Sequence, residues 1–283
     1  MRANPAGADA GLMRCLWAAL TGQLDEWRGD WRTLIDVGRA LTLEEFFALP
    51  EKTDKEVFEA FAIAILSGNT RWDRIARVRG ELNGPFQGYD PVRFAALSED
   101  EIDGLIVPWF RERRAGAAGL RSALARLRLT AERLSPHGAQ SSGGQDYLRE
   151  AAAASDGTPE DLAVILGSSK RWKLPGFGIA LSAEALRLLG VDLCKPDRHV
   201  LRAMACWSLV AFRRWDRRGA FTAPQADVRE LRETMVAVRA IADANGVGVS
   251  YANSVIWLAG AVSGARLANE ALEAIRQQCG RSG

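Results

Sequence analysis

The stretch Lys173-Leu174-Pro175-Gly176-Phe177-Gly178 is the most informative part of this sequence. A Leu-Pro-Gly-x-Gly sequence predicts a tight turn that lets two helices meet at a sharp angle. Its glycines adopt positive φ angles and bring backbone amides close to a ligand. Amides at the start of the next helix are suited to holding a phosphate. Pro-Gly pairs also form ordinary turns at helix ends, so the turn alone does not establish a binding site.

An aspartate follows this turn at a defined distance. Asp197 stands nineteen positions after Gly178, in Lys195-Pro196-Asp197-Arg198-His199-Val200. Aspartate is a favoured N-cap, so Asp197 can be explained simply as the start of a helix. A carboxylate can also stabilise a developing positive charge, and it can orient or deprotonate a water molecule. We expect His199 to be structural.

Together, the turn and the aspartate resemble the helix-hairpin-helix (HhH-GPD) DNA glycosylases, the superfamily of endonuclease III. The matched positions run from about residue 57 to about residue 202. The resemblance implies that Asp197 is the catalytic aspartate and that the hairpin grips the DNA backbone without reading its sequence, often with a monovalent cation bound to its carbonyls. Backbone contacts to a phosphate would come from Gly176, Phe177 and Gly178, and positive charge from Lys170 and Lys173.

Two further stretches carry a weaker resemblance. The segment Ile65-Leu66-Ser67-Gly68-Asn69-Thr70 is similar to a Leu-Ser-x-Gln-Thr segment whose glutamine enters the space near the extruded base, but here the amide is shorter. It reads equally well as an ordinary helix end. Val107-Pro108-Trp109-Phe110-Arg111 lies where the family has a short turn, and its aromatic rings could stack on a base, although aromatic residues are more often core. The candidates for a base pocket or strand wedge are therefore Asn69, Trp72, Trp109 and Phe110.

The expected reaction follows from a missing lysine. Bifunctional members carry a lysine just after the second glycine, and it attacks the sugar. Ala180 stands at about that position, so we expect a monofunctional glycosylase in which Asp197-assisted water hydrolyses the bond to a damaged or mispaired base. The alternatives are a bifunctional glycosylase/AP lyase with a relocated lysine such as Lys195, a non-catalytic DNA-binding protein, and a helical scaffold with an accidental turn. The sequence does not name the lesion.

The secondary-structure signals predict an all-α fold, with capping boxes at Thr42, Thr53 and Ser98 and a cap at Thr158. By the resemblance, two helical domains flank a cleft. Residues 53–190 form a barrel carrying the helix-hairpin-helix, and residues 1–52 plus 191–283 form the second domain, with Asp197 at the junction. We expect an irregular loop at residues 135–144. Later helices are predicted at residues 183–189, 200–210, 229–242, 253–262 and 265–277.

Composition limits the other function classes. Among 283 residues, 37 Lys and Arg balance 35 Asp and Glu, so the overall charge favours no partner, and each basic cluster is more often a solvated face. We expect a monomer that acts on lesion-containing double-stranded DNA, in the cytoplasm and near the nucleoid, with no membrane span. The cysteines lack the spacing of a zinc or iron–sulfur site, so no cofactor or metal is expected. Free thiols are predicted for Cys15, Cys194, Cys206 and Cys279.

Overall fold

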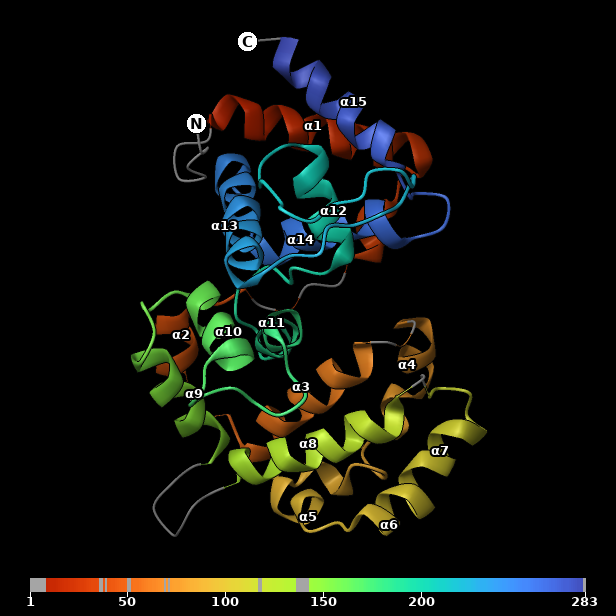
Figure 1. Cartoon of the computed structure of the whole chain (residues 1–283), viewed down its shortest axis with the longest axis vertical. Coiled ribbons are helices and arrows are strands. Elements are labelled where there is room, and N and C mark those ends of the chain that lie inside the picture. The colour runs from red at the N-terminus through yellow and green to blue at the C-terminus, as the bar shows by residue number, and fades with distance from the viewer. Residues whose placement is uncertain are drawn as a thin grey trace. The chain divides into compact units, whose positions relative to one another are not determined.

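The computed structural model describes residues 9–35, 38, 40–49, 52–68, 70, 72–116, 119–135 and 143–281. These residues are built from helices and contain no β-strand, which confirms the all-α prediction (Figure 1). Within the described ranges, one isolated parallel bridge joins Leu41 to Val191. Contacts divide the chain into two compact units. We call Leu43–Leu189 the central unit, from its place in the sequence, and Met1–Thr42 with Gly190–Gly283 the terminal unit. Their assignment as glycosylase domains stays a prediction.

The helices of each unit have the following bounds. The central unit contains α2 (Leu43–Ala48), α3 (Asp54–Ser67), α4 (Trp72–Val78), α5 (Pro91–Ala95), α6 (Glu99–Glu101), α7 (Val107–Glu112), α8 (Leu120–Leu134), α9 (Gly144–Ala153), α10 (Pro159–Ser168) and α11 (Ile179–Leu188). The terminal unit contains α1 (Ala10–Trp27), α12 (Arg198–Cys206), α13 (Val228–Asn245), α14 (Val249–Ala261) and α15 (Asn269–Arg281). Short 3-10 helices lie at Trp31–Leu34, Arg79–Glu81 and Gln87–Tyr89, and a π-helical turn lies at Ile102–Ile106.

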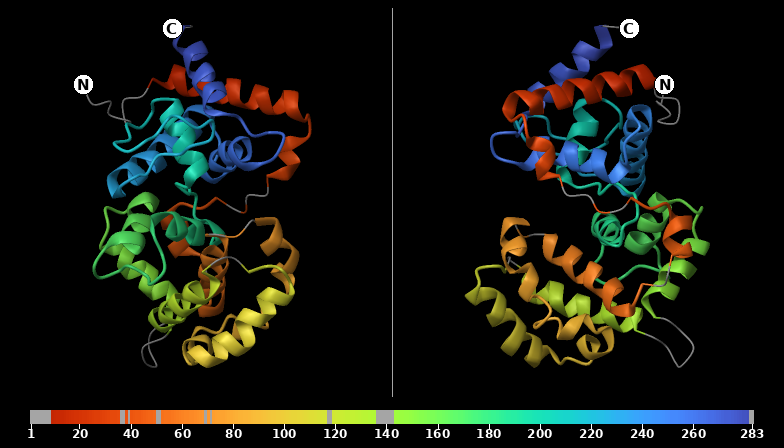
Figure 2. Two further views of the ribbon diagram at one scale, coloured as in Figure 1. Left: turned by 45° about the vertical axis from the view of Figure 1, so that its right-hand side comes forward. Right: turned by 180° about the vertical axis from the view of Figure 1, so that it is seen from behind.

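Helix α3 forms the centre of the central unit, and Figure 2 shows it beside α8 and α11. It begins with the predicted capping box, in which the Thr53 hydroxyl accepts from the Glu56 amide at 3.3 Å and the Glu56 carboxylate accepts from the Thr53 amide at 2.9 Å. Both faces of α3 are apolar, from Val57 to Leu66, and these residues are buried apart from Glu59. A helix that is hydrophobic all round must be covered on several sides, and α8, α9 and α11 cover this one.

The terminal unit packs α1 against α13 and α15, and α14 against α12 and α13. Its helices lie close to the predicted ranges, with one clear difference. The helix predicted to continue to residue 210 ends at Cys206, because Ser208 adopts a φ of +56° and the Leu209 amide turns back to the Met204 carbonyl at 3.0 Å. A capping box at Asp227 and Glu230, which we did not anticipate, starts α13.

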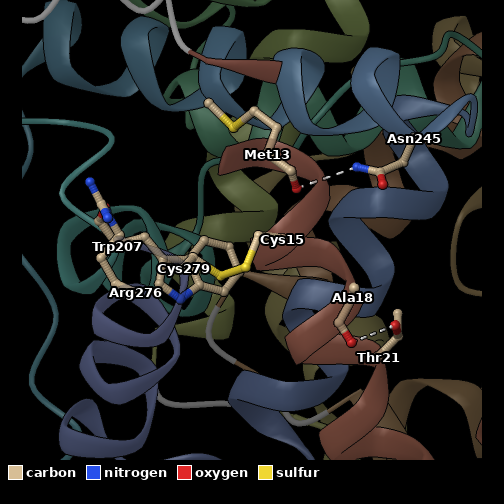
Figure 3. The surroundings of a disulfide bond; sticks show 8 residues. All are labelled: Met13, Cys15, Ala18, Thr21, Trp207, Asn245, Arg276 and Cys279. Atoms are coloured by element: carbon tan, nitrogen blue, oxygen red, sulfur yellow. Dashed lines mark hydrogen bonds between the residues drawn. A yellow bond between two sulfur atoms is a disulfide. The ribbon is translucent and has the colours of Figure 1, made fainter. Parts of the chain in front are cut away.

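The prediction of four free thiols is wrong for two of the cysteines. Cys15 of α1 and Cys279 of α15 form a disulfide with a Cα–Cα distance of 5.6 Å, across 264 positions of sequence (Figure 3). No local spacing could reveal this pair, because folding alone brings the two helices together. The bridge also disagrees with the reducing compartment expected from the sequence, since disulfides persist mainly in oxidising environments. Cys194 and Cys206 are buried thiols.

In the described part of the chain, no helix is both long enough and apolar enough to cross a membrane. Within the same residues, no group of three or more His, Cys, Asp or Glu side chains is placed to hold a metal ion. The loop expected at residues 135–144 is described only at its ends. Gly144 already belongs to α9, and its amide donates to the Asp54 carboxylate at 2.8 Å.

Candidate functional site

The connection between α10 and α11, residues 169–178, is a tight turn built around Gly176. We call it the glycine turn. Gly176 has a φ of +84°, and an added Cβ would lie 2.9 Å from Arg126 Cβ and 3.1 Å from Ile65 Cδ1. Glycine is therefore required here both for its backbone conformation and for space. Leu174 and Phe177 anchor the turn in the core, where the Phe177 ring meets Phe61 edge to face at 5.2 Å.

Hydrogen bonds from α8 hold the outer carbonyls of the glycine turn. Thr130 Oγ1 donates to the Pro175 carbonyl at 2.8 Å, and Arg133 donates to the Lys173 carbonyl at 2.5 Å. Inside the turn, the Phe177 amide donates to the Leu174 carbonyl at 3.1 Å. A cation on these carbonyls, or a phosphate on the Phe177 amide, would therefore share groups that are already bonded. No local pattern predicted Thr130 or Arg133, which belong to α8 and lie 45 and 40 positions before their partners.

The end of the glycine turn is open. Gly178 is exposed and is the N-cap of α11, with no side-chain hydrogen bond capping the helix. An added Cβ on Gly178 would meet nothing within 4 Å. Lys170 and Lys173, on the same turn, are also exposed. Uncapped amides at a helix start, with positive charge nearby, form an arrangement suited to an anion. Ala180, at the position where a lysine nucleophile was considered, is the second residue of α11.

Backbone contact between two helices fixes the direction in which α11 leaves the turn. Gly167, near the end of α10, packs so closely that an added Cβ would lie 2.4 Å from the Ile179 amide nitrogen. The Leu174 amide also donates to the Leu166 carbonyl at 3.0 Å. The glycine turn is thus supported by α10 beneath it as well as by α8 beside it.

In the terminal unit, Asp197 is the N-cap of α12. Its Oδ1 atom accepts from the amides of His199 at 2.9 Å and Val200 at 3.2 Å. Both bonds end on the same oxygen of a half-buried carboxylate. This geometry fulfils the structural role expected from the sequence, and whether Asp197 is catalytic stays a prediction.

A strap formed by residues 190–196 fixes the approach to Asp197. Both carboxylate oxygens of Asp192 accept amides at the start of α14, from Val249 at 2.9 Å and from Ser250 at 2.7 Å. The Lys195 amide donates to Oδ1 of Asn253 at 3.0 Å, and Asn253 is only 2% exposed. Asp192 therefore caps a helix that begins 57 residues later. Such long-range caps leave no pattern in the local sequence, and these positioning residues were missed.

His199 and Arg202 attach α12 to α14. An added Cβ on Gly260 of α14 would lie 2.8 Å from His199 Cβ, so the His199 side chain packs directly against the backbone of α14. Burial lowers the pKa of His199, although the Asp197 carboxylate acts in the opposite direction. Arg202 is 1% exposed, and its guanidinium donates to the carbonyls of Leu267 and Gly260 at 2.7 and 3.4 Å. Burial lowers the pKa of Arg202 as well.

The weaker candidates fall into three situations. Asn69 lies outside the described residues, as does the side chain of Trp72 at the start of α4. Residues 107–111 were expected to form a short turn, and this is wrong, because they belong to α7, which a proline near its start helps to begin. Phe110 is fully buried and packs on Phe86 with ring centroids 6.1 Å apart, as a core residue does. Trp109 is half-buried beneath the Arg113 guanidinium at 4.2 Å.

The predicted DNA-binding residues therefore lie together on one turn of the central unit, whereas Asp197 belongs to the terminal unit. Comparison of the chain with protein-family models, with curated proteins and with solved structures gives no match.

Proposed function

We propose that this protein is a monofunctional DNA glycosylase that removes a damaged or mispaired base and leaves an abasic site. The observation that carries the proposal is the glycine turn. Gly176 cannot carry a side chain, and Gly178 leads into an uncapped helix, with two exposed lysines earlier on the same turn. The aspartate at the start of α12, nineteen positions after Gly178, supplies the second part of the resemblance.

In this proposal the glycine turn holds DNA through its backbone. The open amides at the start of α11 donate hydrogen bonds to a phosphate, and Lys170 and Lys173 add sequence-independent attraction. Because these contacts are made mainly by main-chain atoms, they position the duplex without selecting a sequence. A lesion would be selected elsewhere, by the pocket that receives the extruded base.

Asp197 carries out the chemical step. As the bond between the base and the sugar breaks, positive charge develops on the sugar, and the nearby carboxylate stabilises it. The same carboxylate orients or deprotonates the water that attacks the sugar carbon. The strap bonded to α14 supports this role, because a carboxylate held in place needs little reorganisation during the reaction. With alanine at position 180, water rather than an amine is the nucleophile.

The experiment measures base release from duplexes that each carry one lesion, with strand breaks resolved before and after alkali. Asp197→Asn is the informative variant, because asparagine caps helices as well as aspartate does and removes only the charge. Asp90→Asn is the matched control, since Oδ1 of Asp90 also accepts two amides, at the start of α5. We expect the Asp197 variant to lose about 100-fold or more of its activity, and the Asp90 variant to keep it.

The other outcomes separate the alternatives. Breaks that appear without alkali, together with a covalent adduct after borohydride, would indicate a glycosylase/AP lyase, and loss of the adduct in Lys195→Ala would identify the amine. No base release on any lesion, with DNA binding retained, would indicate a non-catalytic DNA-binding protein. One observation favours this second candidate, because the two amide bonds at Oδ1 already explain Asp197 as a helix cap.

A further inference from the structure

The long connection between α12 and α13, drawn in cyan in Figure 1, contains a surface that the proposed reaction does not use. We call residues 211–225 the arginine loop. It contains Trp215 and Phe221 among its arginines, and Phe221 is 43% exposed. The number of arginines alone would indicate only a solvated surface. Its internal bonding and its cavity give it more specific chemistry.

The arginine loop is held in shape by its own hydrogen bonds. The Gln225 amide donates to the Arg214 carbonyl at 2.9 Å and closes the loop. Trp215 Nε1 donates to the Thr222 carbonyl at 3.3 Å, and Thr222 Oγ1 donates to the Asp216 carbonyl at 2.6 Å. These bonds fix the indole ring before any ligand arrives, which lowers the entropy cost of binding.

The arginine loop is also attached to α12. The side-chain amide of Asn269 donates to the carbonyls of Gly219 and Thr222 at 3.1 and 3.4 Å, and its oxygen accepts from Arg202 at 3.2 Å. Because Asn269 and Arg202 are both buried, these bonds form inside the unit rather than at its surface. The loop is therefore a supported part of the fold.

The charges of the arginine loop divide into paired and available groups. Arg213 forms ion pairs with Asp227 and Glu230, and Arg218 pairs with Asp216 at 2.9 Å. Arg214 and Arg217 are exposed, and neither forms an ion pair with any other residue that the structure describes. The Arg217 guanidinium lies over the Trp215 ring at 4.4 Å. Two guanidinium groups beside a fixed indole are thus available to a ligand.

A cavity of about 320 Å³ opens between the two sides of the loop, at the lower end of the usual range for small-ligand pockets. It is lined by Arg214, Trp215, Asp216, Thr222, Ala223 and Gln225. Guanidinium groups suit phosphate, and an indole suits the face of a base. We propose that this cavity binds a nucleotide, with its base against Trp215 and its phosphate at Arg214, which lines the cavity. Arg217, which lies over the Trp215 ring outside the lining, adds a second guanidinium to the same phosphate.

This proposal rests on the proposed function in one respect, the source of the nucleotide. We assign the nucleotide to a single-stranded segment of the DNA that the glycosylase binds. The same chemistry would accept a free mononucleotide, so the experiment includes both. Binding is measured by anisotropy of a labelled oligothymidylate of roughly 8 nucleotides, over a series of salt concentrations, with full-length protein. Base release is measured separately on the same preparations.

We expect Arg214→Ala/Arg217→Ala to weaken oligonucleotide binding about tenfold and to reduce the slope of log affinity against log salt by about 0.7, the value for one lost phosphate contact on single-stranded DNA. Trp215→Ala should weaken binding by a similar factor, and Trp215→Phe should keep most of it because a stacking ring remains. Arg229→Ala is the matched control, since Arg229 is exposed in the same unit and pairs with Glu233 at 2.7 Å. Its binding and salt slope should match the wild type.

Each outcome supports or overturns the assignment. An arginine double variant that keeps its helical circular dichroism and binds like Arg229→Ala would overturn it, and so would displacement of the oligonucleotide by polyglutamate as effectively as by DNA. Displacement by thymidine monophosphate at similar concentrations would support the nucleotide site and assign it to free nucleotides. Loop-dependent binding without base release would refute the proposed glycosylase but not the nucleotide site. Base release, together with oligonucleotide binding that does not depend on the arginine loop, would refute the nucleotide site but not the proposed glycosylase.

Discussion

The glycine turn of the central unit and the arginine loop of the terminal unit are both suited to phosphate, but they differ in what they present. The turn offers main-chain amides, and its shape depends on Gly176, and on Gly167 of α10 beside it, neither of which has room for a side chain. The loop offers guanidinium groups, and its shape depends on hydrogen bonds from Trp215, Thr222 and Asn269. A backbone site is therefore sensitive to steric change, whereas a side-chain site is sensitive to loss of charge.

The disulfide should distinguish the two regions most strongly. It connects α1 to α15, the helix that carries Asn269 and so holds the arginine loop, and both helices belong to the terminal unit. We expect Cys15→Ser/Cys279→Ser to lower the free energy of unfolding of this unit by about 4 kcal/mol, because the bridge closes a very long loop of the unfolded chain. Hydrogen exchange resolved by segment would measure the effect.

In that experiment, protection of the amides in α10 and α11 should change little, which provides the internal control. Equal loss of protection in both regions would mean that the units unfold together. The disulfide would then stabilise the glycine turn as much as the arginine loop, contrary to this prediction.

A steric change should affect the turn and leave the loop intact. We expect Gly167→Ala to lower the free energy of unfolding by about 3 kcal/mol, because its Cβ would press on backbone atoms of Ile179 that cannot move independently. Denaturant unfolding measures this value. The matched control is Gly178→Ala, whose Cβ meets open space and should cost no more than about 1 kcal/mol, the preference of an N-cap for glycine over alanine.

If Gly178→Ala leaves stability unchanged and weakens binding to duplex DNA, the open start of α11 is a contact surface. Unchanged binding would argue against a phosphate at this position, and wild-type stability in Gly167→Ala would contradict the close crossing of α10 and α11.

The smallest expected difference concerns pH. Burial places the pKa of His199 below its unfolded value, which is about 6.5. The unfolded state therefore binds a proton first as the pH falls, so the contribution of His199 to stability is present above about pH 6.5 and is lost below it. The groups around His199 are Asp197, Arg198, Arg202 and the Gly260 backbone.

His199→Gln should flatten the fall in the free energy of unfolding between about pH 7 and pH 5. Denaturant unfolding at several pH values measures the difference between the variant and the wild type. Identical pH profiles would show that His199 is not buried as described. The glycine turn contains no histidine and should show no such dependence.

Local signals predicted a large part of the fold. The caps at Thr53, Ser98 and Thr158 depend on residues three positions apart, and all three form. The features that the sequence did not reveal depend on distant partners. Asp192 caps a helix that begins 57 residues later, and Cys15 forms a disulfide with Cys279 across 264 positions.

In the candidate site, too, local features were predicted and contacts with distant residues were not. The glycine turn was expected because its conformation is encoded in five adjacent residues, and the positive φ of Gly176 confirms this. The positive φ expected for Gly178 is wrong, because Gly178 is extended, with a φ of −101°, as the N-cap of α11. The groups that support it, Thr130 and Arg133, come from another helix and had no signal. Residues 107–111 were misjudged because a resemblance suggested a turn, whereas a proline near the start of a helix is a normal helical residue.

The bridge between Leu41 and Val191 has a consequence for engineering. The Leu41 amide donates to the Gly190 carbonyl at 2.8 Å, and the Asp192 amide donates to the Leu41 carbonyl at 2.7 Å. The chain therefore leaves the terminal unit and returns to it at adjacent points. A gene in which a short glycine-rich linker replaces Leu43–Leu189 would encode a continuous terminal unit. The excised segment, Leu43–Leu189, could be inserted through its two ends into a loop of another host protein.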